Sequence, residues 1–165
     1  TDVLSGEPYY FTNPPVEKSN AILAASSAIP IFSPMVQIDE KNYVDGGTSD
    51  PIPFQKALDD GCDKLVIILT RPREYTKQRE KLRTAYHRTY RSYPELIKTL
   101  DNRHETYNQS RALALELEKE GKAIILAPSE PMKVGRFEKN VVNLTSLYGL
   151  GIKDGSTSLK QILSL

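Results

Sequence analysis

A continuous apolar run at residues 64–70, KLVIILT, constrains the fold more than any other stretch of the chain. Its β-branched residues favour a strand, and the lack of polar alternation is typical of a strand buried on both faces of a parallel sheet. Helical spacing at residues 16–27 and from Phe54 to Gly61 places two helices before the run, with a strand pair at 36–44 between them. This alternation of helices and strands predicts a layered α/β domain.

The remaining segments carry their own start and stop signals, with Gly121 ending one helix and Ser156 or Thr157 starting another. The expected elements are a short aromatic strand at 7–13, a basic helix at 76–90, a longer helix at 94–120, an apolar strand at 123–128, a helix from 141 that is capped near 149–151, and a short final helix.

The strand pair delivers Asp45-Gly46-Gly47 at its exit. Glycine allows positive φ and close backbone approach, so we expect the chain to turn sharply after Asp45. In open α/β sheets, ligands bind outside the carboxyl ends of the strands. Asp45 is therefore the first candidate for chemistry, and a plain Asp-Gly turn is the alternative.

The amino-acid composition limits the classes of protein to which this chain can belong. The 165 residues are 39% apolar and 26% charged, as in a globular domain or part of a larger one. No apolar run approaches the ~18 residues that a membrane span needs, and the first residues lack the pattern of a signal peptide. The single cysteine, Cys62, excludes an internal disulfide and fits a reducing compartment. Because the chain does not begin with Met, we expect it to start inside a longer protein.

Charge is unevenly distributed along the chain. Residues 1–70 carry a net charge of −6 and residues 71–104 a net charge of +6, although the whole chain is only +1. The basic block at 71–104 could face an anionic surface such as phospholipid headgroups, or it could be a solvated helix face beside an acidic neighbour.

Two motifs lie close together in the first part of the chain. The first is the Ala/Ser-rich helix end with its proline-rich exit at 25–34, ASSAIPIFSP, and the second is the strand exit at 43–47, YVDGG. Together, at this separation, the two motifs resemble those of the patatin-like phospholipases. A later set of residues resembles the C-terminal extension of a bacterial subgroup of the family: YRSYP at 90–94, Arg103-His104, Tyr107-Asn108, Gly121-Lys122 and APS at 127–129. The resemblance implies that residues 1–70 are the back part of a three-layer α/β/α hydrolase domain and that 71–165 are an α-rich extension.

The resemblance also implies a serine hydrolase of acyl lipids with a Ser–Asp dyad. Asp45 corresponds to the aspartate that activates the serine hydroxyl, and Gly46 and Gly47 turn the backbone so that the carboxylate faces the nucleophile. The family's Gly-x-Ser-x-Gly nucleophile and Gly-rich oxyanion loop do not occur in these residues. The Gly-x-Ser that ends at Ser49 lacks the second glycine of the Gly-x-Ser-x-Gly signature. Ser49 is therefore interpreted as a turn residue. We therefore expect a C-terminal fragment that holds half of a dyad and is inactive alone.

The histidines and the cysteine have simpler interpretations. His104 lies on the apolar face of its helix and is expected to be a hydrogen-bonded packing residue. A Ser–His–Asp triad with His87 or His104 is disfavoured, because the family pattern does not use a histidine. Cys62 is expected to be a small structural residue, and with only two histidines it does not make a metal set.

Two further groups of side chains resemble functional sites, but a structural role is the favoured interpretation for each. Asp59, Asp60 and Asp63 lack the spacing of a calcium loop, which favours a solvated helix end. Tyrosines interleaved with arginines could stack on bases, but helix-on-helix packing is the favoured interpretation. These tyrosines are Tyr86, Tyr90, Tyr93 and Tyr107.

The sequence thus predicts part of an acyl-ester hydrolase that contributes Asp45 and needs no cofactor or metal. Its expected partners are an acyl-lipid or small ester substrate, the upstream segment of the same protein and an anionic membrane surface, with no nucleic acid. The expected location is the cytoplasm, peripheral to the membrane. The alternative is a non-catalytic binding or regulatory module that docks a membrane or a protein through the basic block at 71–104.

Overall fold

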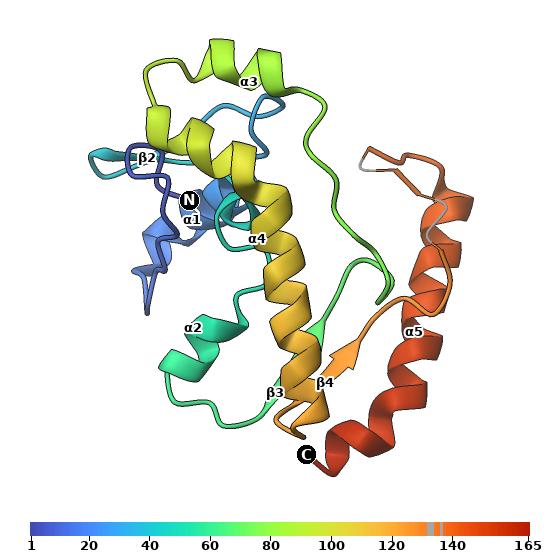
Figure 1. Cartoon of the computed structure of the whole chain (residues 1–165). Coiled ribbons are helices and arrows are strands. Elements are labelled where there is room, and N and C mark those ends of the chain that lie inside the picture. The colour runs from blue at the N-terminus through green and yellow to red at the C-terminus, as the bar shows by residue number, and fades with distance from the viewer. Residues whose placement is uncertain (132–133, 136) are drawn as a thin grey trace. The chain divides into compact units, whose positions relative to one another are not determined.

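The fold is described from a computed structural model of the chain (Figure 1), which covers residues 1–131, 134–135 and 137–165. The chain forms two compact units. The first comprises Thr1–Ile52 and Lys77–Ser110, and the second comprises Pro53–Thr76 and Arg111–Leu165. Helix α4 (Pro94–Lys119) contributes its first part to one unit and its last part to the other.

The first unit places a helix against a β-hairpin. Helix α1 (Val16–Ser26) contacts strand β1 (Val36–Ile38), which pairs antiparallel with β2 (Lys41–Tyr43), so the strand pair expected at 36–44 is confirmed. Asp39 adopts a φ of 54° in the turn, a region that aspartate tolerates. One buried cluster lies between α1 and the hairpin, and a second includes residues of α3 (Arg83–Thr89) and α4. The first consists of Ala25, Ile38 and Tyr43, and the second of Val3, Val44, Tyr86, Tyr90, Leu96 and Leu100.

The aromatic segment at 7–13 forms no strand, so this prediction is wrong. Pro8 cannot donate to a ladder, and the segment is held instead by its side chains. The rings of Tyr9 and Phe11 pack at 4.9 Å, and they lie 5.6 Å and 5.4 Å from the buried ring of Tyr43. Aromatic packing gives the segment a fixed place without backbone pairing.

The second unit is built on a parallel strand pair. Strand β3 (Leu65–Ile68) runs parallel to β4 (Ala123–Leu126), which confirms that the apolar run forms a strand of a parallel sheet. The prediction that this strand is buried on both faces is wrong for this chain. Val66 and Ile68 are 43% and 71% exposed, while Leu65 and Ile67 are buried. Ile68 lines a cavity of about 300 Å³ together with residues of α5 (Val141–Leu163), so α5 covers this face only in part. Helix α2 (Phe54–Asp59) contacts β3 and is followed by Gly61 at a φ of 94°.

The basic helix expected at 76–90 is shorter than predicted. Helix α3 begins at Arg83, and the segment before it is held by side chains of α4. The N–H of Lys77 donates to Asn108 Oδ1 at 2.8 Å, and Asn108 Nδ2 donates to Lys77 O at 3.1 Å. The second bond occupies Lys77 O, which would accept from the N–H four residues on in a helix that began at residue 76. The longer helix expected at 94–120 is confirmed as α4, and Gly121 follows it with a φ of 72°.

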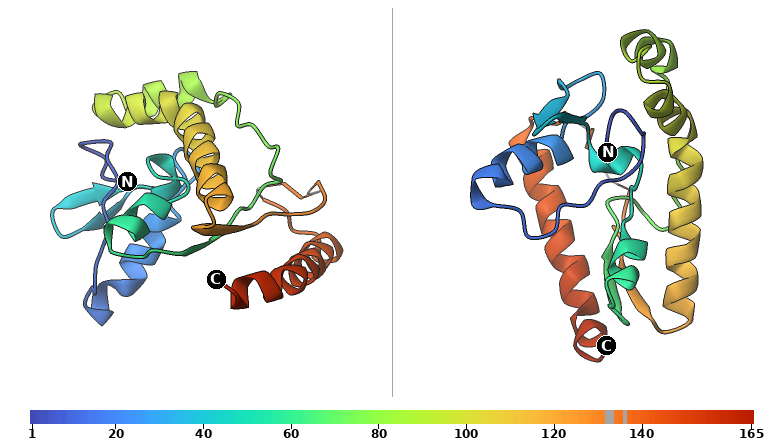
Figure 2. Two further views of the ribbon diagram at one scale, coloured as in Figure 1. Left: turned by 60° about the horizontal axis from the view of Figure 1, so that its bottom comes forward. Right: turned by 90° about the vertical axis from the view of Figure 1, so that its left-hand side faces the viewer.

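Helix α5 is continuous, so the predicted break near 149–151 and the separate final helix are wrong (Figure 2). Asn140 caps its start by accepting a hydrogen bond from Val142 N at 2.9 Å. Thr157 does not cap a new helix, because its hydroxyl donates to Lys153 O one turn earlier at 2.9 Å. Interior glycines cost a helix only about 1 kcal/mol each, and Gly151 lies where α5 lines the cavity beside the strands.

The described residues therefore form an α/β chain with small sheets, as expected. The three-layer arrangement and the division between residues 70 and 71 stay predictions of the resemblance. None of the helices in the described part of the chain has both the length and the apolar character needed to cross a membrane.

Candidate active site

Asp45 lies just after β2, where the chain leaves the hairpin and makes a short 3-10 turn, η1 (Gly46–Thr48). Its Oδ1 atom accepts a hydrogen bond from Gly47 N at 2.7 Å, which caps the turn and fixes one side of the carboxylate. Among the residues that the structure describes, Oδ2 has no hydrogen-bond partner, and the residue is half-buried. One carboxylate oxygen is thus held while the other is available to an incoming hydroxyl.

The sharp turn expected after Asp45 is present, but neither Gly46 nor Gly47 has a positive φ. What matters at Gly47 is space, because a Cβ there would lie 3.1 Å from Asp45 Oδ1. At Gly46 a Cβ would meet only Ser26 Oγ, at 3.8 Å. The absence of a side chain at Gly47 therefore lets the backbone approach the carboxylate that caps it.

The turn is anchored to neighbouring segments of the first unit. The N–H of Asp45 donates to Ala28 O at 2.9 Å, and Thr1 Oγ1 donates to Asp45 O at 2.9 Å. The hydroxyls of Ser49 and Thr1 lie 2.7 Å apart in a hydrogen bond. Ser49 is thus engaged in stabilising the turn, in keeping with its interpretation from the sequence.

An apolar cavity of about 250 Å³ lies beside Gly46. The aromatic side chains come from the 7–13 segment and the hairpin, and the small ones come from α1. Its lining includes Tyr9, Tyr10, Phe11, Ile22, Ala25 and Tyr43. A cavity of this lining suits an apolar group, with a few polar atoms at its edge to fix orientation.

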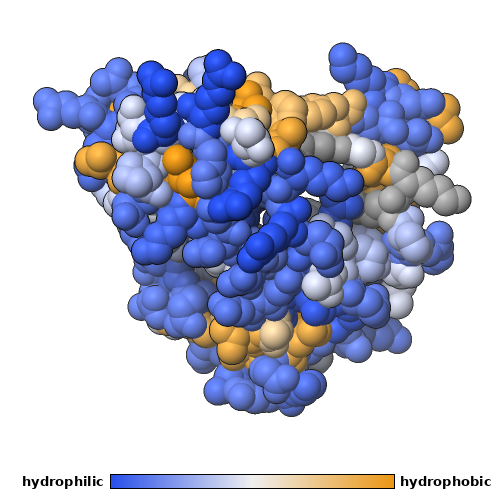
Figure 3. Space-filling view, turned by 45° about the horizontal axis from the view of Figure 1, so that its top comes forward, coloured by the Kyte–Doolittle hydropathy of each residue, from blue (hydrophilic) through white to orange (hydrophobic). Residues whose placement is uncertain are grey.

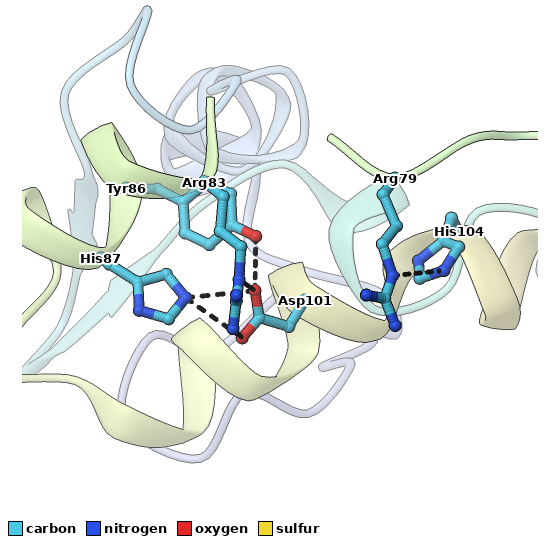
Figure 4. Close-up of polar contacts among 6 residues, drawn as sticks. All are labelled: Arg79, Arg83, Tyr86, His87, Asp101 and His104. Carbon is cyan, nitrogen blue, oxygen red and sulfur yellow. Dashed lines mark hydrogen bonds and ion pairs between the residues drawn. The ribbon is translucent and has the colours of Figure 1, made fainter. Parts of the chain in front are cut away.

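A separate polar cluster on α3 and α4 is centred on Asp101 (Figure 4). Arg83 donates from Nε and Nη2 at 2.8 Å and 3.2 Å, and the Tyr86 hydroxyl donates at 2.6 Å. His87 Nε2 lies 3.1 Å from both carboxylate oxygens. The guanidinium of Arg83, with the tyrosine and the histidine, holds the pKa of Asp101 well below its usual range. Burial and the bond to Asp101 raise the pKa of Tyr86.

This cluster is not a catalytic triad in the described residues. Its histidine and aspartate are in contact, but no serine hydroxyl bonds to either of them. The carboxylate oxygens are already used by Arg83 and Tyr86, so the arrangement ties α3 to α4.

His104 is largely buried, as expected of a packing residue, with its side chain 14% exposed. Arg79 Nε donates to its Nε2 at 3.3 Å (Figure 4), whereas Nδ1 is buried without a hydrogen-bond partner in the described part of the chain. Packing is also confirmed for Tyr86 and Tyr90, which are 4% and 2% exposed, and the Tyr90 hydroxyl accepts from Ile31 N at 2.9 Å.

The other candidate groups show no ligand geometry. Within residues 1–131, 134–135 and 137–165, no three His, Cys, Asp or Glu side chains gather as a metal site would require. Cys62, expected to be a small structural residue, is exposed. Asp59, Asp60 and Asp63 are exposed at the end of α2, as a solvated helix end predicts.

In the described part of the chain, half of the ten lysines and arginines of the basic block at 71–104 form ion pairs with carboxylates. These residues are Arg73, Lys77, Arg83, Lys98 and Arg103. Of these five, only Arg73 pairs with an acid outside the block, Glu118, so the other pairs use acids that the net charge of +6 already includes. The face drawn in Figure 3 is mostly hydrophilic, with apolar residues in separate groups.

Comparison with known proteins divides the chain into two matched segments. Residues 6–58 match the family model described as patatin-like phospholipase, and residues 93–165 match a domain of unknown function, DUF6363. The uncharacterized protein YjjU of Escherichia coli (strain K12) is 43% identical over 60 residues. That match covers 34% of this chain and 17% of the length of YjjU.

The matched segment at 6–58 contains the hairpin, the Asp45 turn and most of the residues that line the apolar cavity. The motifs that resembled the family in the sequence lie within it, at 25–34 and 43–47. Residues 6–58 of the chain are therefore similar to the patatin-like phospholipase family.

Proposed function

We propose that this chain contributes the catalytic aspartate of an acyl-ester hydrolase. The observation that carries the proposal is the state of Asp45 within the patatin-like segment: Oδ1 is held by Gly47 N at 2.7 Å, and Oδ2 is unpaired among the described residues. A carboxylate fixed on one side can accept the proton of a serine hydroxyl with the other and so activate it for attack on an ester carbonyl. The serine is supplied by a segment of the full-length protein outside these 165 residues.

The substrate class follows from the cavity beside the turn. Its aromatic and aliphatic lining suits the acyl chain of a lipid ester or the apolar part of a small ester. The reaction that we propose is hydrolysis through an acyl-enzyme, in which neither a metal nor an organic cofactor takes part. The alternative is docking of an anionic surface through the basic block, in which half of the cations form ion pairs within the described residues.

Asp45→Asn in the full-length protein tests the proposal. The amide oxygen can still accept from Gly47 N, so the turn is kept while the base is lost. We expect kcat for a fatty-acyl ester to fall by about 10³-fold or more, as for the loss of a triad acid. The measurement is turnover of a chromogenic acyl ester, with folding checked by circular dichroism.

Asp39→Asn is the matched control, because Asp39 is exposed in the β1–β2 turn and pairs only with Lys18 among the described residues. It should leave kcat unchanged. Turnover by Asp45→Asn within a fewfold of the wild type would contradict the proposal. The isolated 165-residue chain should show no ester hydrolysis, and turnover that Asp45→Ala abolishes in that chain would place the nucleophile within it.

A further inference from the structure

The turn that carries Asp45 leaves one of its carbonyl groups without a backbone donor. In η1, Gly46 O accepts hydrogen bonds from Ser49 N at 3.2 Å and from Asp50 N at 3.0 Å. The corresponding donor for Gly47 O, four residues on, would be residue 51, which is a proline and has no N–H. Gly47 O is therefore left to accept a hydrogen bond from outside the turn.

Arg103 of α4 supplies this hydrogen bond. Its Nε donates to Gly47 O at 2.8 Å, and its side chain is only 18% exposed. Its Nη1 donates to Glu80 Oε1 at 3.0 Å, and Lys77 Nζ lies 3.0 Å from the same oxygen. Because the guanidinium is a rigid fork, the bond to Glu80 fixes the direction in which Nε meets Gly47.

Gly47 connects this guanidinium to the candidate base. Its N–H donates to Asp45 Oδ1, while its C=O accepts from Arg103. A Cβ on Gly47 would lie 3.1 Å from Asp45 Oδ1 and 3.9 Å from Arg103 Nη2, so both charged groups lie close to this one small residue. Arg103 and Asp45 form no direct ion pair among the described residues, so the arginine acts through the backbone.

We propose that Arg103 is a positioning residue that orients Asp45 by fixing Gly47, an inference that rests on the proposed function. With the guanidinium in place, the Gly47 N–H points at Oδ1 and the direction of Oδ2 is set. Arg103 belongs to the segment that matches the domain of unknown function, whereas Gly47 belongs to the patatin-like segment. The C-terminal segment thereby supports the geometry of the catalytic turn.

The test compares Arg103→Gln and Arg103→Lys with a matched control, Arg83→Gln, in the full-length protein. Arg83→Gln also removes an ion pair to α4, the one with Asp101, but does not touch Gly47. The first readout is amide hydrogen exchange in peptides that cover Gly46–Asp50, and the second is kcat and KM for an acyl ester. Arg103→Gln should speed exchange and lower kcat by about tenfold to hundredfold, with KM nearly unchanged, since small misplacements of a catalytic group are costly.

Arg103→Lys keeps the charge but not the fork, so it should fall between Arg103→Gln and the wild type in both readouts. The proposal is overturned if Arg103→Gln leaves exchange or kcat unchanged, or if Arg83→Gln shifts both as strongly. If the wild type shows no Asp45-dependent hydrolysis, the proposed function fails. Faster amide exchange in Arg103→Gln would then still support the claim that Arg103 fixes the turn at Gly47. Unchanged exchange would refute that claim.

Discussion

Gly6→Ala tests a close backbone contact that helps to build the first unit. Gly6 adopts a φ of 71°, and a Cβ there would lie 2.6 Å from both Glu95 O and Thr99 Oγ1 of α4. Thr99 Oγ1 also donates to Gly6 O at 2.9 Å. The N-terminal loop therefore rests directly on the first turns of α4, in a space that has no room for a side chain.

The expected loss of stability has two opposing local terms and one steric term. A left-handed φ costs alanine about 1–2 kcal/mol. Alanine also lowers the conformational entropy of the unfolded chain, which offsets about 0.4–1 kcal/mol of this loss of stability. Overlap with the backbone of α4 forces the loop to move, which adds about 1–3 kcal/mol. We expect the free energy of unfolding to fall by about 1–5 kcal/mol in total.

Gly121→Ala separates the steric term from the others. Gly121 has nearly the same φ, 72°, but no atom lies within 4 Å of where its Cβ would stand. Gly121→Ala should therefore lower the free energy of unfolding by only about 1 kcal/mol. Urea unfolding followed by circular dichroism measures both, each against the wild type. If Gly6→Ala costs no more than Gly121→Ala, the loop does not pack on α4 as described.

Two further predictions follow from the polar cluster and from the cysteine. Because the pKa of Asp101 is depressed in the folded chain, its contribution to stability is present above its ordinary value of 3.8 and is lost as the pH falls below it. Asp101→Asn should thus cost about 1–2 kcal/mol near neutral pH, and less in acid, by urea unfolding at several pH values; an equal cost at every pH would contradict this origin. Cys62, being exposed, should react with a thiol reagent as fast as a free thiol, and Cys62→Ser should change stability by less than about 0.5 kcal/mol; slow labelling in the folded chain would show that the thiol is covered.

The elements that the sequence predicted well are those with local signals. Helix α4 begins at Pro94 and is followed by a left-handed glycine, both of which are visible in the chain. The hairpin at 36–44 and the strands β3 and β4 themselves also follow from short-range patterns of apolar residues. Such signals act over a few residues, so they can be interpreted without knowing what lies nearby.

The features that the sequence did not predict depend on contacts between distant segments. The glycines of α5 look like caps, yet the helix continues through them, since an interior glycine costs a helix only about 1 kcal/mol. The contact of Arg103 with Gly47 joins residues 56 positions apart, and the one local hint was Pro51, which deprives the carbonyl of a donor. No periodicity in the sequence could indicate which side chain would fill that need.

The geometry of the Asp45 turn depends on helices outside the patatin-like segment. Val44, which precedes Asp45, is 1% exposed in a cluster with residues of α3 and α4. Ile31 adopts a φ of 76°, a strained conformation for a β-branched residue, and its N–H is held by the hydroxyl of Tyr90. Removing residues 77–110 would therefore expose Val44 and release the strained loop at Ile31 together. A fragment that ends after residue 58 should then fail to hold Asp45 in a defined turn, even though every residue of the motif is present.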